Sequence, residues 1–140
     1  IAPLEDPRWL GVFHSDYGET LARQGQQDVT LEHYETALKH SRAVSDNVTT
    51  VRTLCRLGDL QRDMGDFDAA GANYAKAVHN AQVMGDQRNL AYAYLGQGLL
   101  ALAQQQAEKA RKLLNDAKRL LTILHAPEAQ QAEAALQQLA

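Results

Sequence analysis

The sequence has little of several residue types, and each shortage narrows the class of protein. It contains a single cysteine, Cys55, so it can form neither a disulfide framework nor a thiolate metal cage. Only three of its 140 residues are proline, which leaves room for long helices. No apolar run is long enough to cross a membrane, and no secretory signal pattern is present. These absences favour a cytoplasmic protein that has no membrane partner.

The numbers of basic and acidic residues are nearly equal, at 14 and 17. The formal net charge is −3, so we expect no bulk attraction to nucleic acid or to anionic lipid. The basic residues between Lys109 and Arg119 are interrupted by Glu108 and Asp116 and have no aromatic residue among them. That pattern is typical of a solvated helix face, so no nucleic-acid partner is expected.

Residues that could perform chemistry do not form a recognisable constellation. No two of the five histidines are spaced to bind a metal from one helix, and the aspartates between positions 59 and 68 do not follow the spacing of a calcium loop. No glycine-rich phosphate loop occurs, and no base lies next to Cys55 in the sequence. We expect His14 at the edge of the core and the other histidines in solvent. The sequence therefore predicts no enzyme activity, no metal and no cofactor.

A 40-residue period is the strongest pattern in the chain. Shifting the sequence by 40 positions superimposes several residues without a gap: Gly18 on Gly58 and Gly98, Gly25 on Gly65, Tyr34 on Tyr74, and Ala37 on Ala77 and Ala117. Within each period, apolar residues recur at the spacing of one helix face, and no stretch alternates as a strand would. The pattern predicts an all-α repeat protein.

Glycine, aspartate and proline mark the helix boundaries. Gly65-Asp66 and Gly85-Asp86 each combine a glycine that can end one helix in a left-handed conformation with an aspartate that can cap the next. Asp6-Pro7 and Pro127 mark the starts of the first and last helices. Because the joints are short, neighbouring helices must be antiparallel. We expect seven helices, at about 7–24, 27–44, 47–64, 67–84, 87–104, 107–124 and 127–139.

Gly18, Gly58 and Gly98 fall in the middle of expected helices, where each costs about 1 kcal/mol relative to alanine. Close approach of the next helix would offset that cost, with the small residues twelve positions later on the partner: Thr30, Ala70 and Ala110. Such pairs repeated end to end form an α-solenoid of three antiparallel helix-turn-helix units, about 7–46, 47–86 and 87–126, with helix 127–139 as a cap. We expect residues 1–140 to form this one domain.

The second unit resembles the tetratricopeptide repeat family. It carries the small and large residues of that pattern in Leu57-Gly58, Gly65, Phe67, Ala70, Tyr74 and Ala77. The resemblance covers about residues 7–125, and its 40-residue period is similar to that of long-repeat members such as kinesin light chains and peptide-sensing bacterial regulators. The third unit departs from the pattern, with Gln105 in place of the glycine and Ala107 in place of the phenylalanine. The resemblance implies a right-handed superhelix whose concave groove binds proteins or peptides.

The first helix of each pair lines the concave surface of such an array, and this selects the candidate contacts. They are Glu19, Arg52, Arg56, Asp59, Arg62 and Tyr92. Arg52, Arg56 and Asp59 follow helical spacing and share one face. Two interpretations stay open: the arginines capture carboxylates of a partner, or Arg56 only pairs with Asp59 or Asp63 of its own helix.

Three leucines on the expected inner face of the third unit form a second candidate surface: Leu95, Leu99 and Leu102. A leucine cluster exposed to water is uncommon in a monomer. The cap helix, a second copy of the chain or another partner could cover it.

Together these features predict a non-catalytic scaffold that binds a protein or peptide segment. Two alternatives are a regulatory sensor domain of a bacterial signalling or transcription regulator, and a homo-oligomerisation module that uses the apolar third unit. Because the chain begins with Ile1 rather than methionine, we also expect a piece of a longer protein.

Overall fold

The computed structural model describes residues 7–140, which contain helices and short turns but no strand. The seven helices are α1 (Pro7–Arg23), α2 (Gln27–Ala43), α3 (Asn47–Asp63), α4 (Phe67–Met84), α5 (Gln87–Ala103), α6 (Ala107–Ile123) and α7 (Ala129–Gln137). The predicted bounds of the first six are confirmed to within one residue. α7 is shorter than predicted, because Pro127 and Glu128 form a turn in which their carbonyls accept from the amides of Gln130 and Gln131. Asp6, the predicted cap of α1, lies outside the described residues.

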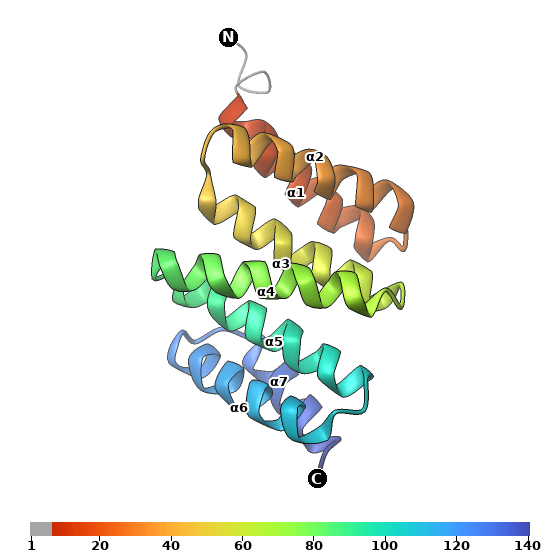
Figure 1. The fold of residues 1–140 in the computed structure, drawn as a ribbon, viewed down its shortest axis with the longest axis vertical. Helices are drawn as coiled ribbons and strands as arrows, with labels where there is room; N and C mark the ends of the chain where they lie inside the picture. Colours follow the sequence, from red (N-terminus) through yellow and green to blue (C-terminus); the bar gives the residue numbers. More distant parts are fainter. Residues whose placement is uncertain (1–6) are drawn as a thin grey trace.

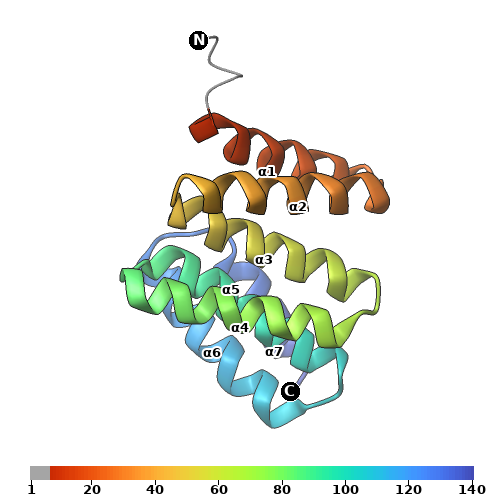
Figure 2. The same ribbon diagram turned by 45° about the horizontal axis from the view of Figure 1, so that its top comes forward.

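The helices stack as consecutive antiparallel pairs (Figure 1). α1 packs against α2, α3 against α4, and α5 against α6, while α7 closes the array against α6 and α5. Between pairs, α3 contacts both α1 and α2, and α5 contacts both α3 and α4. The first helices of the three pairs therefore form one contiguous layer, and α1 and α2 lie at one end of the stack (Figure 2).

The joints between helices repeat one geometry. Asp46, Asp66 and Asp86 each precede a helix and accept a hydrogen bond from the backbone amide three residues later, at 3.1, 3.4 and 3.1 Å. A residue with positive φ follows each of the first six helices. These residues recur every 20 positions: Gly25, Ser45, Gly65, Gly85, Gln105 and His125. The predicted roles of Gly65-Asp66 and Gly85-Asp86 are confirmed.

The mid-helix glycines accommodate large side chains of the following helix. A β-carbon on Gly58 would lie 2.6 Å from Cε1 of Tyr74, and one on Gly18 would lie 2.7 Å from Cε1 of Tyr34. A β-carbon on Gly98 would likewise lie 2.7 Å from Cδ2 of Leu114. The predicted close approach is therefore present, but the prediction that small residues lock the pairs is wrong, because a large side chain sixteen positions later fills the space. Thr30, Ala70 and Ala110 are nonetheless fully buried.

Candidate binding groove

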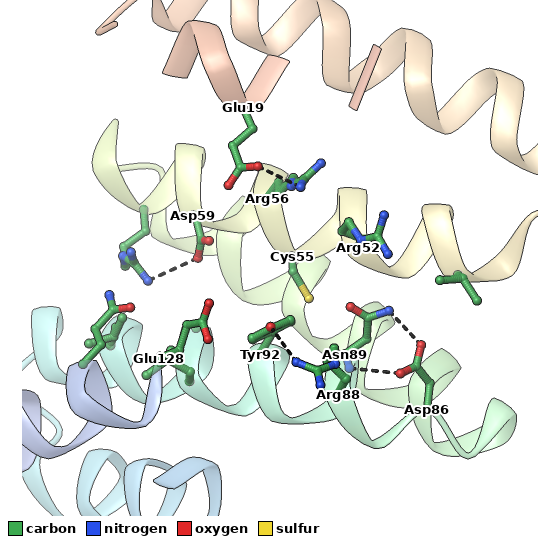
Figure 3. A pocket seen from close by; sticks show the side chains of 16 residues that line it. Glu19, Arg52, Cys55, Arg56, Asp59, Asp86, Arg88, Asn89, Tyr92 and Glu128 are labelled. Atoms are coloured by element: carbon green, nitrogen blue, oxygen red, sulfur yellow. Dashed lines mark hydrogen bonds and ion pairs between the residues drawn. The ribbon is translucent and has the colours of Figure 1, made fainter. Parts of the chain in front are cut away.

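A groove of about 550 Å³ opens between α3 and α5, with further walls from α1 and from the start of α7 (Figure 3). All six predicted contact residues line it: Glu19, Arg52, Arg56, Asp59, Arg62 and Tyr92. They converge because α1, α3 and α5 form one layer and present equivalent faces to the same side. Leu95 and Leu99 also line the groove, whereas Leu102 does not.

Arg56 ties the first unit to the second. Its guanidinium lies 2.9 Å from the carboxylate of Asp16 and 2.8 Å from that of Glu19, and it donates a further hydrogen bond to Ser15 Oγ. The predicted pairing with Asp59 or Asp63 is therefore wrong. The partners come from α1 because α1 lies directly beside α3, and only 19% of the Arg56 side chain stays exposed. Arg56 thus already has two carboxylate partners within the chain.

Asp59 belongs to a second internal network. It accepts a hydrogen bond of 2.5 Å from the Tyr74 hydroxyl and lies 3.4 Å from Arg62. Partial loss of hydration beside α4 raises the pKa of Asp59, while 52% of its side chain stays exposed. Arg62 opposes that shift, as does the Tyr74 hydrogen bond. The network ties the hydroxyl of Tyr74 on α4 to Asp59 and Arg62 on α3.

Two arginines of the groove have no carboxylate partner among the described residues. Arg52 on α3 forms no ion pair, and Arg88 on α5 hydrogen-bonds only to the hydroxyl of Tyr92, at 3.4 Å. The carboxylates of Asp86 and Glu128 act on the charge of Arg88 without forming an ion pair with it. The nearby carboxylate of Asp86 is held by the backbone amide and the side chain of Asn89, at 3.1 and 2.7 Å. Both guanidiniums are therefore able to bind an external acceptor (Figure 3).

Arg88 was missed by the sequence prediction, although a signal was present. It precedes Tyr92 by four residues and so lies on the same face of α5 as Tyr92, Leu95 and Leu99. The predicted inner face of α5 starts at Tyr92, one helical turn after Arg88.

The floor of the groove is apolar and chemically inert. It includes Cys55, which is 6% exposed, together with Leu95 and Gly96. Burial raises the pKa of the Cys55 thiol strongly, and the negative charges of Asp59 and Asp86 raise it further. A thiol that stays protonated is a weak nucleophile, so this floor offers contact area rather than reactivity.

α7 closes one end of the groove and covers the leucines of the third unit. Leu95, Leu99 and Leu102 belong to one apolar cluster with four residues of α7: Ala129, Ala132, Ala135 and Leu136. Of the three coverings considered for these leucines, the structure favours the cap helix. Glu128, just before α7, also lines the groove, and its Oε2 is buried without a hydrogen-bond partner.

Residues 10–82 match the model of the tetratricopeptide repeat. The chain belongs to the tetratricopeptide repeat family. The match covers the first two units, and the third, which carries Gln105 and Ala107 in place of the pattern's glycine and phenylalanine, lies outside it. Curated proteins yielded no match.

Two solved tetratricopeptide-like arrays share the fold. The apo form of RapI superposes with a TM-score of 0.87 at 16% identity, over 99% of this chain and 51% of RapI. BtubC (BKLC) from P. vanneervenii superposes with a TM-score of 0.81 at 21% identity, over 96% of this chain and 56% of BtubC. The chain thus spans just over half the length of each, and at these identities the likeness shows the fold alone.

The remaining polar clusters of this tetratricopeptide array lie away from the groove. His14 Nδ1 lies 2.9 Å from His33 Nδ1, and its ring stacks on those of His33 and His40. The prediction that His33 and His40 are solvated is wrong, because α1 and α2 bring all three together into partial burial. No group of residues between 7 and 140 has the arrangement of a metal site.

Three of the five basic residues of α6 are paired with carboxylates. Arg111 lies 2.5 Å from Glu108, Arg119 lies 3.8 Å from Asp116, and Lys118 pairs with Glu133 of α7. This pairing agrees with the interpretation of α6 as a solvated face. None of the described helices is both long and apolar enough to span a membrane.

Proposed function

We propose that this chain is a non-catalytic scaffold whose concave groove binds an extended protein or peptide segment that carries an acidic side chain. The observation that carries the proposal is the pair Arg52 and Arg88, which lie in one groove without carboxylate partners. Arg56 and Arg62 already form ion pairs within the chain. The guanidiniums of Arg52 and Arg88 are therefore the groove cations that a negatively charged partner could neutralise. An external carboxylate would form charge-assisted hydrogen bonds with them.

The rest of the groove fits the backbone and side chains of such a segment. Its volume of about 550 Å³ is within the range of ligand pockets and suits a few residues of extended chain. Leu99 and Tyr92, which are partly exposed, offer apolar and aromatic contact beside the arginines. The buried Oε2 of Glu128 lacks a donor, which a backbone amide of the bound segment would supply.

A scaffold role is supported by the rigidity of the walls and by the family. The lining side chains stand on helices that are held by Tyr74, Arg56 and the capping aspartates, so binding would require little ordering of the protein. Tetratricopeptide repeat domains are generally non-catalytic and bind proteins.

The proposal is tested by selecting peptides from a random library displayed on phage against the immobilised chain. We expect the enriched peptides to share an acidic residue with an apolar neighbour. Their affinity is then measured by fluorescence anisotropy for the wild type and for Arg52→Glu/Arg88→Glu. Loss of two charge-assisted contacts should weaken binding by at least about tenfold, equivalent to about 1.4 kcal/mol.

A charge-matched control is available on α6. Lys109→Glu/Lys112→Glu changes the net charge by the same amount on exposed residues that do not line the groove. This variant should keep wild-type affinity. Equal weakening in both variants would reduce the effect to bulk charge, and unchanged affinity in Arg52→Glu/Arg88→Glu would refute the groove as the binding site.

A further inference from the structure

A second, smaller hollow lies beside the groove, between α1, α2 and α3. Its volume is about 260 Å³, and Tyr34 of α2 forms part of its wall. Three residues line both this hollow and the groove, so the two adjoin along α3 (Figure 3): Glu19, Arg56 and Asp59. We call the smaller hollow the Tyr34 pocket.

The hydroxyl of Tyr34 has no hydrogen-bond partner among the described residues. Tyr34 is only 2% exposed, and its ring packs on Gly18 as the ring of Tyr74 packs on Gly58. Burial raises the pKa of Tyr34 to about 12, so the hydroxyl keeps its proton at neutral pH. Because a buried polar group normally has a partner, the pocket is the place from which a partner for this hydroxyl can come.

The equivalent tyrosine of the second unit shows what such a hydroxyl binds. The Tyr74 hydroxyl, forty residues further on, donates to Asp59 at 2.5 Å and accepts from the Arg62 guanidinium at 3.1 Å. In the first unit the position of Arg62 is occupied by Ala22, which lines the pocket and has no polar side-chain atom. The first unit therefore has the tyrosine of this arrangement without its guanidinium.

The charges of the Tyr34 pocket favour a cation. Its lining carries three acidic side chains and two basic ones. The two basic side chains, Arg23 and Arg56, both pair with Glu19, at 3.3 and 2.8 Å. Asp63 also lines the pocket and forms no ion pair among the described residues. A positively charged group would find the carboxylate of Asp63 and the hydroxyl of Tyr34 as acceptors in one pocket.

We propose that the Tyr34 pocket binds an arginine side chain of the segment that occupies the groove. The guanidinium takes the place beside Tyr34 that Arg62 has beside Tyr74, and donates to the Tyr34 hydroxyl and to the carboxylate of Asp63. A hollow of about 260 Å³ is smaller than most pockets for whole ligands and suits one long side chain. The inference rests on the proposed function, since it adds a second contact to the same bound segment.

The length of α3 sets the spacing between the two charged contacts. Arg52 in the groove and Asp63 in the pocket are eleven residues apart on this helix, which is about 16 Å along its axis. An extended segment covers that distance in about five residues. The expected partner therefore carries an acidic residue and an arginine about five positions apart.

An NMR titration of the ¹⁵N-labelled chain with N-acetyl-L-argininamide tests the pocket, because this probe carries the basic side chain without an acidic group. We expect binding in roughly the millimolar range, with the largest shifts at amides around the pocket. Tyr34→Phe keeps the buried ring and should weaken binding about fivefold, and Asp63→Asn should weaken it about tenfold. Ala22→Arg should abolish binding, because the chain itself then supplies the guanidinium.

Two controls isolate the charge and the position. N-acetyl-L-citrullinamide has a similar shape without the charge and should bind at least about tenfold more weakly. Glu35→Gln removes one negative charge from an exposed residue of α2 that does not line the pocket, and should bind the arginine probe as the wild type does. Absence of binding, equal binding of the two probes, or unchanged affinity in folded Tyr34→Phe and Asp63→Asn would each overturn the assignment.

This test and the test of the groove fail separately. The probe has no carboxylate, so its binding does not require Arg52 or Arg88 to meet a partner. If the probe binds as expected but Arg52→Glu/Arg88→Glu leaves peptide affinity unchanged, the acidic contact is wrong and the Tyr34 pocket stands. If the peptides respond but the probe does not bind, the pocket assignment is wrong and the groove contact stands.

Discussion

Replacement of Gly96 by alanine tests the packing that joins the second and third units. The Tyr74 ring is completely buried and lies between Gly58 on α3 and Gly96 on α5. A β-carbon on Gly96 would lie 2.6 Å from Cζ of Tyr74 and still closer to Cε1. The ring has little room to move, because Gly58 on α3 also lies close to it and Asp59 holds its hydroxyl.

The magnitude follows from three terms. Alanine is favoured over glycine in a helix by about 1 kcal/mol. Overpacking against a ring without free space costs about 1–3 kcal/mol. Displacing the hydroxyl from Asp59 costs about 1 kcal/mol more. We expect Gly96→Ala to lower the free energy of unfolding by about 1–3 kcal/mol, which leaves the protein folded if its stability is in the usual range of about 5–15 kcal/mol.

Urea denaturation followed by circular dichroism measures this change, with Gly71→Ala as the control. Gly71 is also inside a helix, but a β-carbon there would meet only Cδ2 of Leu100, at an ordinary 3.6 Å. Gly71→Ala should therefore stabilise the chain by up to about 1 kcal/mol. The two substitutions should have opposite signs. If Gly96→Ala stabilises as much as Gly71→Ala does, the packing of Tyr74 against glycine does not constrain the array.

Three further predictions concern single residues. Gln105 has a φ of 61°, so Gln105→Gly should relieve a left-handed conformation and raise the free energy of unfolding by about 0.5–1 kcal/mol, measured in urea. Burial, with the charges of His33 and His40, lowers the pKa of His14 below 6.5 in the folded state. The stability contributed by neutral His14 is thus present above pH 6.5 and is lost as the pH falls below it. The melting temperature should drop between about pH 7.5 and about pH 5.5, and less so in His14→Gln. Cys55 should react with a thiol reagent far more slowly in the native chain than in urea, and equal rates would contradict its burial.

Helix positions and the residues of the groove were accessible from the sequence because their signals are local or periodic. Gly65-Asp66 ends one helix and caps the next within two residues, and the structure agrees. The 40-residue period then places equivalent faces of α1, α3 and α5 side by side, which is why Glu19, Arg52 and Tyr92 line one groove.

Partners across the array could not be predicted in this way. Arg56 has acidic residues within reach on its own helix, yet it pairs with Asp16 and Glu19, which are about forty positions away in the chain. The choice depends on the distance and rotation between α1 and α3, and no local pattern encodes either. The meeting of His14 with His33 and His40 has the same origin.

The sequence by itself therefore determined the number and order of the helices and the bounds of the first six, since capping, left-handed turns and apolar period act over a few residues. It also determined that arginines of α3 and Tyr92 of α5 line one groove. Only the tertiary structure decided which of those arginines are already neutralised, because an ion pair depends on atoms within a few ångströms of each other. That distinction is why we propose Arg52, together with Arg88, rather than Arg56 and Arg62 as the contacts of a partner.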